Sequence, residues 1–278
     1  MAVWIILILG LVQGASEFLP ISSSGHLVVF YNVFNVHDNT ILLSIVLHVA
    51  TLLSVLFCYW KDALLLIKNP FCKTNKLLVC ATIPTVIFAL ILKKFVEESF
   101  GGGFVIVGFL ITAVVLIVTQ LITNKQQNHI LCATNGGFVS KSDSITNLQI
   151  SFKQALFIGV AQGIAVFPGI SRSGSTIAMG LISGVKKSDA ADFSFLLSIP
   201  IILGGLLFEL VDVFSGKASL NISWVNLSVG FVASFLSGLV CVKLMIKFVK
   251  NKKLTWFSLY LILLSLFLIL NRFVLGWF

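Results

Sequence analysis

The feature that most constrains this chain is a series of apolar runs, each long enough to cross the hydrocarbon core of a bilayer. There are six, at about residues 40–60, 77–93, 104–123, 191–213, 222–246 and 254–276. Of the 278 residues, 58% are hydrophobic and only 10% are charged. A soluble domain of this size needs more charge on its surface, whereas a helix bundle in lipid is apolar outside as well as inside. The sequence predicts an all-α integral membrane protein and argues against a disordered chain, a secreted disulfide scaffold and a nucleic-acid-binding protein.

The N-terminus and the cysteines indicate no other class. Residues 2–12 are apolar, but no basic residue precedes them, so we expect no cleaved signal peptide. The cysteines are scattered and form no C-x-x-C pair, which argues against a zinc site or a disulfide framework. They are Cys58, Cys72, Cys80, Cys132 and Cys241.

Two further apolar stretches, residues 1–35 and 151–185, are interrupted by Ser, Gly and Pro at residues 20–25 and 168–174. We expect each stretch to form two half-helices joined by a loop that dips into the membrane and returns. The stretches are also related, because residues 9–26 align with 158–175 at a constant offset and eight of the eighteen aligned positions are identical. The identical pairs are Gly10/Gly159, Gln13/Gln162, Gly14/Gly163, Phe18/Phe167, Ile21/Ile170, Ser22/Ser171, Ser24/Ser173 and Gly25/Gly174.

Three spanning runs follow each copy, which predicts a duplicated membrane domain. Its first repeat is residues 1–123, a cytoplasmic linker is 124–150, and the second repeat is 151–278. The predicted architecture is therefore six transmembrane helices plus two re-entrant helix-loop-helix segments, arranged as two inverted-topology repeats. Broken helices at membrane depth are tolerated where they line a cavity, so the two loops predict a polar site near the midplane.

The basic residues set the expected orientation. Most fall on loops that share one side of this topology, which the positive-inside rule assigns to the cytoplasm, with both termini outside. The exceptions are Lys93, Lys94, Lys217 and Arg272. This distribution also accounts for most of the net charge of +9 without a polyanionic partner.

The first broken stretch carries an acid, a histidine and serines. Glu17 and Gln13 are four residues apart and share one helix face. A carboxylate inside a membrane segment is costly, which favours a functional role for Glu17, whereas Gln13 is either a ligand or a packing residue. His26 follows Ser22 and Ser23, where an imidazole could act as general base for a serine hydroxyl or for water. The other histidines, His37, His48 and His129, have no such neighbours in the sequence.

The second broken stretch carries Arg172 in a chain whose cations are otherwise almost all lysines. A guanidinium in a Ser/Gly loop at a helix start suits a bidentate grip on phosphate oxygens. The surrounding candidate phosphate-binding residues are Gly169, Ser171, Ser173, Gly174 and Thr176, with Ser22 from the first loop. The alternative is that Arg172 and Glu17 form a purely structural buried ion pair.

These motifs resemble those of a known family. Gln13-x-x-x-Glu17-Phe-Leu-Pro20-x-Ser22-Ser23-x-Gly25-His26 and Pro168-Gly169-x-Ser171-Arg172-Ser173-Gly174-x-Thr176 look like the two signatures of the undecaprenyl-diphosphate phosphatase family, the bacitracin-resistance type. The run from Phe193 to Pro200 is similar to a further family segment, so the resemblance covers nearly the whole chain.

The resemblance implies an enzyme of the bacterial inner membrane that hydrolyses undecaprenyl diphosphate to undecaprenyl phosphate, recycling the carrier lipid for peptidoglycan synthesis, with its site open to the periplasmic or extracellular side. It implies catalytic roles for Glu17, His26, Ser23 and Arg172. It also implies a divalent cation, Mg²⁺ or Ca²⁺, held by Glu17 and Gln13, although glutamine at position 13 leaves only one carboxylate in that pair. The implied partners are the polyprenyl diphosphate and membrane lipids, without nucleic acid, and a homo-oligomer is compatible with the sequence.

Two other functions fit parts of the pattern. Inverted repeats with broken helices are the architecture of secondary transporters, so a polyprenyl-phosphate flippase is the main alternative. A lipid phosphatase of the phosphatidic-acid type is disfavoured, because that class needs a further histidine soon after the Ser-Arg pair and residues 173–181 contain none.

Overall fold

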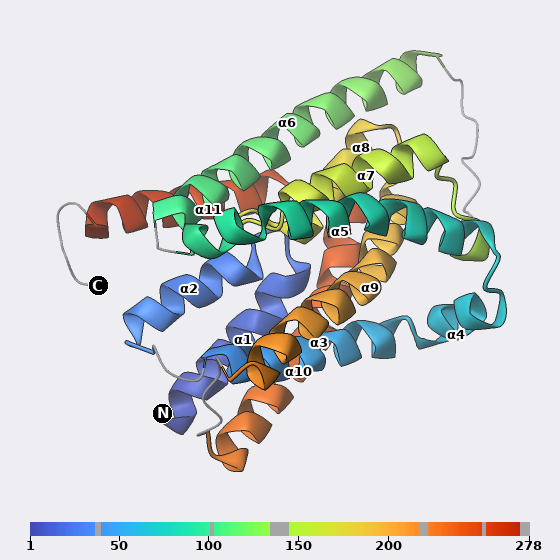
Figure 1. The fold of residues 1–278 in the computed structure, drawn as a ribbon. Helices are drawn as coiled ribbons and strands as arrows, with labels where there is room; N and C mark the ends of the chain where they lie inside the picture. The colour runs from blue at the N-terminus through green and yellow to red at the C-terminus, as the bar shows by residue number, and fades with distance from the viewer. Residues whose placement is uncertain (37–39, 101–102, 134–144, 217–221, 252–253, 273–278) are drawn as a thin grey trace.

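The computed structural model describes the chain except residues 37–39, 101–102, 134–144, 217–221, 252–253 and 273–278 (Figure 1). All regular structure in the described residues is helical. The elements are α1 (Val3–Phe18), α2 (Ser23–Val33), α3 (Thr40–Cys58), α4 (Trp60–Lys68), α5 (Lys73–Ser99), α6 (Gly103–Ala133), the short 3₁₀ helix η1 (Ile145–Asn147), α7 (Phe152–Ile164), α8 (Arg172–Ile182), α9 (Lys187–Phe214), α10 (Trp224–Asn251) and α11 (Thr255–Leu270).

Among the described residues, five helices are long and apolar enough to cross a membrane, namely α3, α5, α6, α9 and α10. They coincide with five of the six predicted runs, and the protein is therefore a multi-pass membrane protein. The sixth run corresponds to α11, which is apolar but has only 16 residues. The short helix α4 was not predicted. The middle of the predicted linker 124–150, residues 134–144, lies outside the described residues.

Both interrupted stretches form pairs of helices. α1 and α2 are separated at residues 19–22, and α7 and α8 at residues 165–171. Figure 1 shows the breaks near the centre of the bundle, with the N-terminus and the far end of α2 toward one end and the start of α7 toward the other. The two breaks meet, because the Ser173 hydroxyl at the start of α8 donates to the Leu19 carbonyl of the first loop at 3.0 Å.

Local chemistry explains why a helix restarts after each break. Ser22 precedes α2 and Ser171 precedes α8, and each hydroxyl accepts a hydrogen bond from the amide of the glycine three residues later, Gly25 at 3.3 Å and Gly174 at 3.0 Å. A serine at this position satisfies an amide that the first helical turn leaves unpaired. Ser22 adopts a positive φ of 70°, so the first break turns more sharply than a serine ordinarily allows.

Glycines let α1 and α7 approach their neighbours closely. A Cβ at Gly10 of α1 would lie 2.6 Å from the Gly230 carbonyl oxygen of α10, and a Cβ at Gly159 of α7 would lie 2.2 Å from the Ala81 carbonyl oxygen of α5. Small residues at such contacts are typical of membrane helix packing. These close contacts hold the C-terminal end of α1, and the polar residues on it, against the bundle.

Candidate active site

A cavity of about 180 Å³ lies where the broken helices meet α3, α5 and α9. Its apolar walls come from α9 and from the loop after α7. Its polar lining residues are Glu17, Ser23, His48, Thr85, Gln162, Arg172 and Glu209. A small cavity with ionisable groups among apolar helices is the kind of place where a membrane protein binds a charged ligand.

Glu17 is the centre of the polar network. Arg172 pairs with its Oε1 through Nη2, and the Ser23 hydroxyl donates to its Oε2 at 2.6 Å. The Gln13 amide also donates to Oε2, at 3.0 Å. The Glu17 side chain is only 6% exposed, so its charge is neutralised by the guanidinium rather than by water.

The repeat explains how Ser23 and Arg172 reach the same carboxylate. Each is the first residue of its second half-helix, directly after the capping Ser22 or Ser171. The two positions are equivalent in the aligned repeat, which places a hydroxyl in one copy and a guanidinium in the other. Glu17, at the end of α1, lies between them because the two breaks meet.

The ion pair with Glu17 engages only one of the two terminal nitrogens of Arg172. Its Nη1 is buried and has no hydrogen-bond partner among the described residues. A buried donor of this kind is costly unless a ligand completes it. The guanidinium can therefore hold Glu17 with one nitrogen and donate to an anionic oxygen with the other.

Most of the other predicted phosphate-binding residues bond within the protein. Ser22 and Ser171 cap helices, and the Thr176 hydroxyl shares a hydrogen bond of 2.5 Å with Ser194. Gly169 has φ +87° and packs so tightly that a Cβ would lie 2.3 Å from the Val105 carbonyl oxygen. These residues, with Ser173 and Gly174, shape the loops around Arg172, and their contact with phosphate stays a prediction.

His26 faces away from this cavity. Its Nδ1 lies 2.7 Å from the Ser22 carbonyl oxygen, and its Nε2 lies 2.7 Å from the Tyr260 hydroxyl. The ring stacks on Tyr260 and meets Phe109 edge-on. Both ring nitrogens are thus engaged, and the structure supports a role in holding the Ser22 backbone beside Ser23. Its predicted role as a general base is not tested by this geometry.

Two ionisable residues of the cavity, His48 and Glu209, were not predicted from the sequence. His48 Nε2 lies 3.9 Å from Glu17 Oε2, and the Ser44 hydroxyl lies 3.1 Å from His48 Nδ1 and donates to Glu209 Oε1 at 2.7 Å. Both lie in predicted spans, where an ionisable residue by itself suggests a functional site. Glu209 is a carboxylate inside the predicted span 191–213, so its position alone could have identified it as a candidate site residue.

A second cavity, of about 540 Å³, shares His48 and Glu209 with the first. It is lined mainly by α2 and the start of α3, and it includes Phe100 after α5. These segments belong to the end of the bundle that holds the N-terminus (Figure 1). The inner cavity thus continues toward that end through the His48–Glu209 pair.

The donor set fits a divalent cation that a phosphate ligand helps to hold. Within the described part of the chain, no three His, Cys, Asp or Glu side chains gather as a self-sufficient metal site. However, the Gln13 Oε1 and Glu209 Oε2 atoms are buried acceptors without a hydrogen-bond partner in the described chain. Mg²⁺ usually takes one or two carboxylates and completes its shell with substrate phosphates and water. The carboxylates that line this cavity, Glu17 and Glu209, meet that requirement.

Comparison with known proteins gives one consistent result. The family model described as bacitracin resistance protein BacA matches residues 6–267. A protein named undecaprenyl-diphosphatase from Carboxydothermus hydrogenoformans is 39% identical over 261 residues, which cover 93% of each chain. Undecaprenyl-diphosphatase 3 from Bacillus cereus is 38% identical over 96% of each chain, and undecaprenyl-diphosphatase from Bacteroides thetaiotaomicron is 37% identical over 96% of this chain and 97% of its own.

Proposed function

The chain belongs to the bacitracin resistance protein BacA family, and from this membership and the cavity around Glu17 we propose that it hydrolyses undecaprenyl diphosphate to undecaprenyl phosphate and inorganic phosphate. This activity would return the carrier lipid to peptidoglycan synthesis and would give resistance to bacitracin. The protein would act in the bacterial inner membrane, on a polyprenyl diphosphate as its lipid partner.

We also propose that its membrane domain consists of two inverted repeats, with α11 as the sixth crossing and the two helix pairs as re-entrant segments. Equivalent contacts support this. Gly10 and Gly159 are equivalent in the aligned repeat, and so are the residues they touch, Gly230 and Ala81, because both pairs differ by the same offset. The site would open outward, since the cavity of about 540 Å³ leads to the end that the lysine distribution assigns to the outside.

The proposed mechanism starts from the Ser23–Glu17–Arg172 arrangement. Arg172 binds the terminal phosphoryl group through Nη1 and stabilises the charge that builds on its equatorial oxygens. The Ser23 oxygen attacks that phosphorus while Glu17, 2.6 Å away, accepts the hydroxyl proton. Undecaprenyl phosphate leaves, and water then hydrolyses the phosphoserine to release phosphate and regenerate Ser23. Direct attack by water, with Glu17 as base, is the alternative path.

A divalent cation would contribute charge neutralisation on the diphosphate oxygens. Glu17 and the unpartnered Gln13 Oε1 are the residues that we propose to hold it, with Glu209 from the opposite wall. His26 holds the Ser22 carbonyl and so keeps Ser23 in line with Glu17.

The observation that carries this proposal is that one buried carboxylate receives both the Ser23 hydroxyl and the Arg172 guanidinium. The test is release of inorganic phosphate from undecaprenyl diphosphate by purified protein in detergent, with and without EDTA. We expect release that needs a divalent cation and falls by at least about 100-fold in Arg172→Ala, the scale seen when one charge-stabilising donor is removed. Folded wild-type protein that releases no phosphate would contradict the proposal.

A polyprenyl-phosphate transporter remains the second candidate, because the broken helices do meet at a central polar cavity. The same assay separates the two functions. A transporter moves its lipid between two compartments and has no turnover in detergent, whereas a phosphatase does. Lipid binding without phosphate release would favour the transporter.

A further inference from the structure

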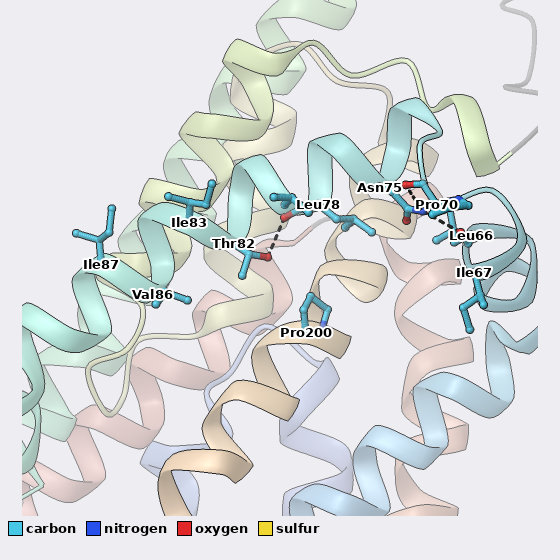
Figure 2. A pocket seen from close by; sticks show the side chains of 11 residues that line it. Leu66, Ile67, Pro70, Asn75, Leu78, Thr82, Ile83, Val86, Ile87 and Pro200 are labelled. Carbon is cyan, nitrogen blue, oxygen red and sulfur yellow. Dashed lines mark hydrogen bonds between the residues drawn. The ribbon is translucent and has the colours of Figure 1, made fainter.

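An apolar groove of about 660 Å³ lies on the side of the bundle, between α4, α5 and α9 (Figure 2). Its wall on α5 is a stripe of side chains that runs from Asn75 to Ile87, and Pro200 of α9 faces it. Several of the lining side chains, among them Val79, Ile83 and Ile87, are about half exposed. The groove therefore opens to the surroundings of the bundle along its whole length.

The polar groups in this groove already have partners. The Thr82 hydroxyl donates to the Leu78 carbonyl within α5 at 2.8 Å (Figure 2). The Asn75 amide donates to the Leu66 carbonyl of α4 at 2.8 Å and to two carbonyls of the α4–α5 turn. A groove whose hydroxyl and amide donors are satisfied internally suits a hydrocarbon ligand, not a polar one.

The groove adjoins the cavity that contains Glu17. On α5, Thr82 and Val86 line the groove and Thr85 lines the cavity; on α9, Pro200 lines the groove and Ile201 the cavity. The cavity is also open sideways at Gly205, which lines it and is exposed. A Cβ added at Gly205 would meet no atom within 4 Å. The polar cavity can thus hold a charged head group while the adjoining groove holds an apolar chain.

We propose that this groove binds the polyprenyl chain of the substrate, which leaves the cavity between α5 and α9 and runs along α5 toward α4. This inference rests on the proposed function, which supplies a ligand with a diphosphate at one end and a long hydrocarbon chain at the other. The direction also fits. An outer-leaflet lipid presents its head group outward and its chain inward, and the groove extends from the cavity toward the end that the lysines assign to the cytoplasm.

The length of the groove makes chain length the property to measure. Residues 75 to 87 of α5 rise by roughly 18 Å, so the groove contacts chain well beyond the isoprene unit that carries the diphosphate. A long chain should gain binding free energy from this contact, whereas a short chain should reach little of it. The decisive quantity is the ratio of kcat/KM for undecaprenyl diphosphate to kcat/KM for dimethylallyl diphosphate, whose single isoprene unit does not reach along the groove.

Two pairs of matched variants test the proposal. Ile83→Trp fills the groove, and Ile91→Trp places the same change two turns further along the same helix, on an exposed side chain that does not line the groove. Gly205→Leu narrows the side opening, and Gly204→Leu is its neighbour, where an added Cβ also meets nothing within 4 Å. We expect Ile83→Trp and Gly205→Leu to lower the long-to-short ratio about tenfold, and the two control variants to leave it unchanged.

An unchanged ratio in Ile83→Trp, or an equal fall in Ile91→Trp, would overturn the proposal. No phosphate release from either substrate by the wild type would instead refute the proposed function, so the two failures are distinguishable.

Cross-linking gives a readout independent of turnover. A polyprenyl phosphate of only a few isoprene units, with a photoreactive group at the far end of this short chain, should label peptides of α4 and α5, and excess undecaprenyl phosphate should prevent this. Labelling that only phospholipid reduces would assign the groove to ordinary membrane lipid and overturn the proposal.

Discussion

Ser23 and Glu17 are in direct hydrogen-bond contact in the cavity, and their roles can be separated by conservative changes. Glu17→Gln keeps the shape of the side chain but removes the proton acceptor and leaves Arg172 without its counter-charge, so we expect phosphate release to fall by about 100-fold to 10,000-fold. Ser23→Ala should cause a loss of similar size if Ser23 is the nucleophile. Stopped assays with ³²P-labelled substrate measure both. Near-normal turnover in Ser23→Ala would assign the attack to water.

His26 shows how a residue can matter for activity without facing the cavity. Its two ring nitrogens contact the Ser22 carbonyl and the Tyr260 hydroxyl. We expect His26→Ala to lower turnover strongly and Tyr260→Phe to lower it less, because the second change leaves the bond to Ser22 intact. The measurement is phosphate release with and without added imidazole. Since the ring does not line the cavity, imidazole should not restore His26→Ala, and rescue would show instead that His26 transfers a proton.

At the scale of elements, the contact between α1 and α10 is set by glycine. A Cβ at Gly14 would lie 2.1 Å from the Ser237 hydroxyl and 2.2 Å from the Ser234 carbonyl oxygen, so any side chain forces the helices apart. We expect Gly14→Leu to destabilise the protein by about 1–3 kcal/mol or more. The fall in Tm in detergent relative to wild type measures this. Gly204→Leu makes the same change where space is free and where helix propensity favours leucine, so an equal fall in Tm there would contradict the assignment of the loss to packing at Gly14.

At the scale of the whole molecule, the orientation can be tested with a native cysteine. Cys72 is a free, partly exposed thiol in the turn between α4 and α5, among lysines that predict the cytoplasmic side. In a variant without the other cysteines, a membrane-impermeant maleimide should label Cys72 only after spheroplasts are permeabilised. Ser215 follows the C-terminal end of α9, which the lysines assign to the outside. In a chain that also lacks Cys72, Ser215→Cys should react with the same maleimide in intact spheroplasts. The reverse pattern would invert the proposed topology.

Glu17 and Arg172 were predicted as site residues because ionisable groups in broken apolar stretches are rare, and Ser23 was predicted from the family resemblance of its motif. The sequence did not predict that His48 and Glu209 line the same cavity as Glu17, because they lie 31 and 192 residues from it along the chain. No local pattern links α3 to α9, since only packing brings Ser44 against Glu209. For the same reason it did not predict Tyr260, whose hydroxyl contacts His26 Nε2 while Nδ1 contacts the Ser22 carbonyl.

The sequence by itself determined the class of protein, five of the six predicted spans and the two half-helix pairs, because hydropathy, helix breakers and internal duplication are properties of neighbouring residues. It also determined that an acid and an arginine lie beside the two breaks. Only the tertiary structure decided which groups face each other: Arg172 and Ser23 on one carboxylate, His48 and Glu209 at the mouth of the cavity, and an apolar groove beside it. Those outcomes depend on how glycines let α1 and α7 approach α10 and α5, and a contact of that kind is fixed by the geometry of packed helices and not by spacing along the chain.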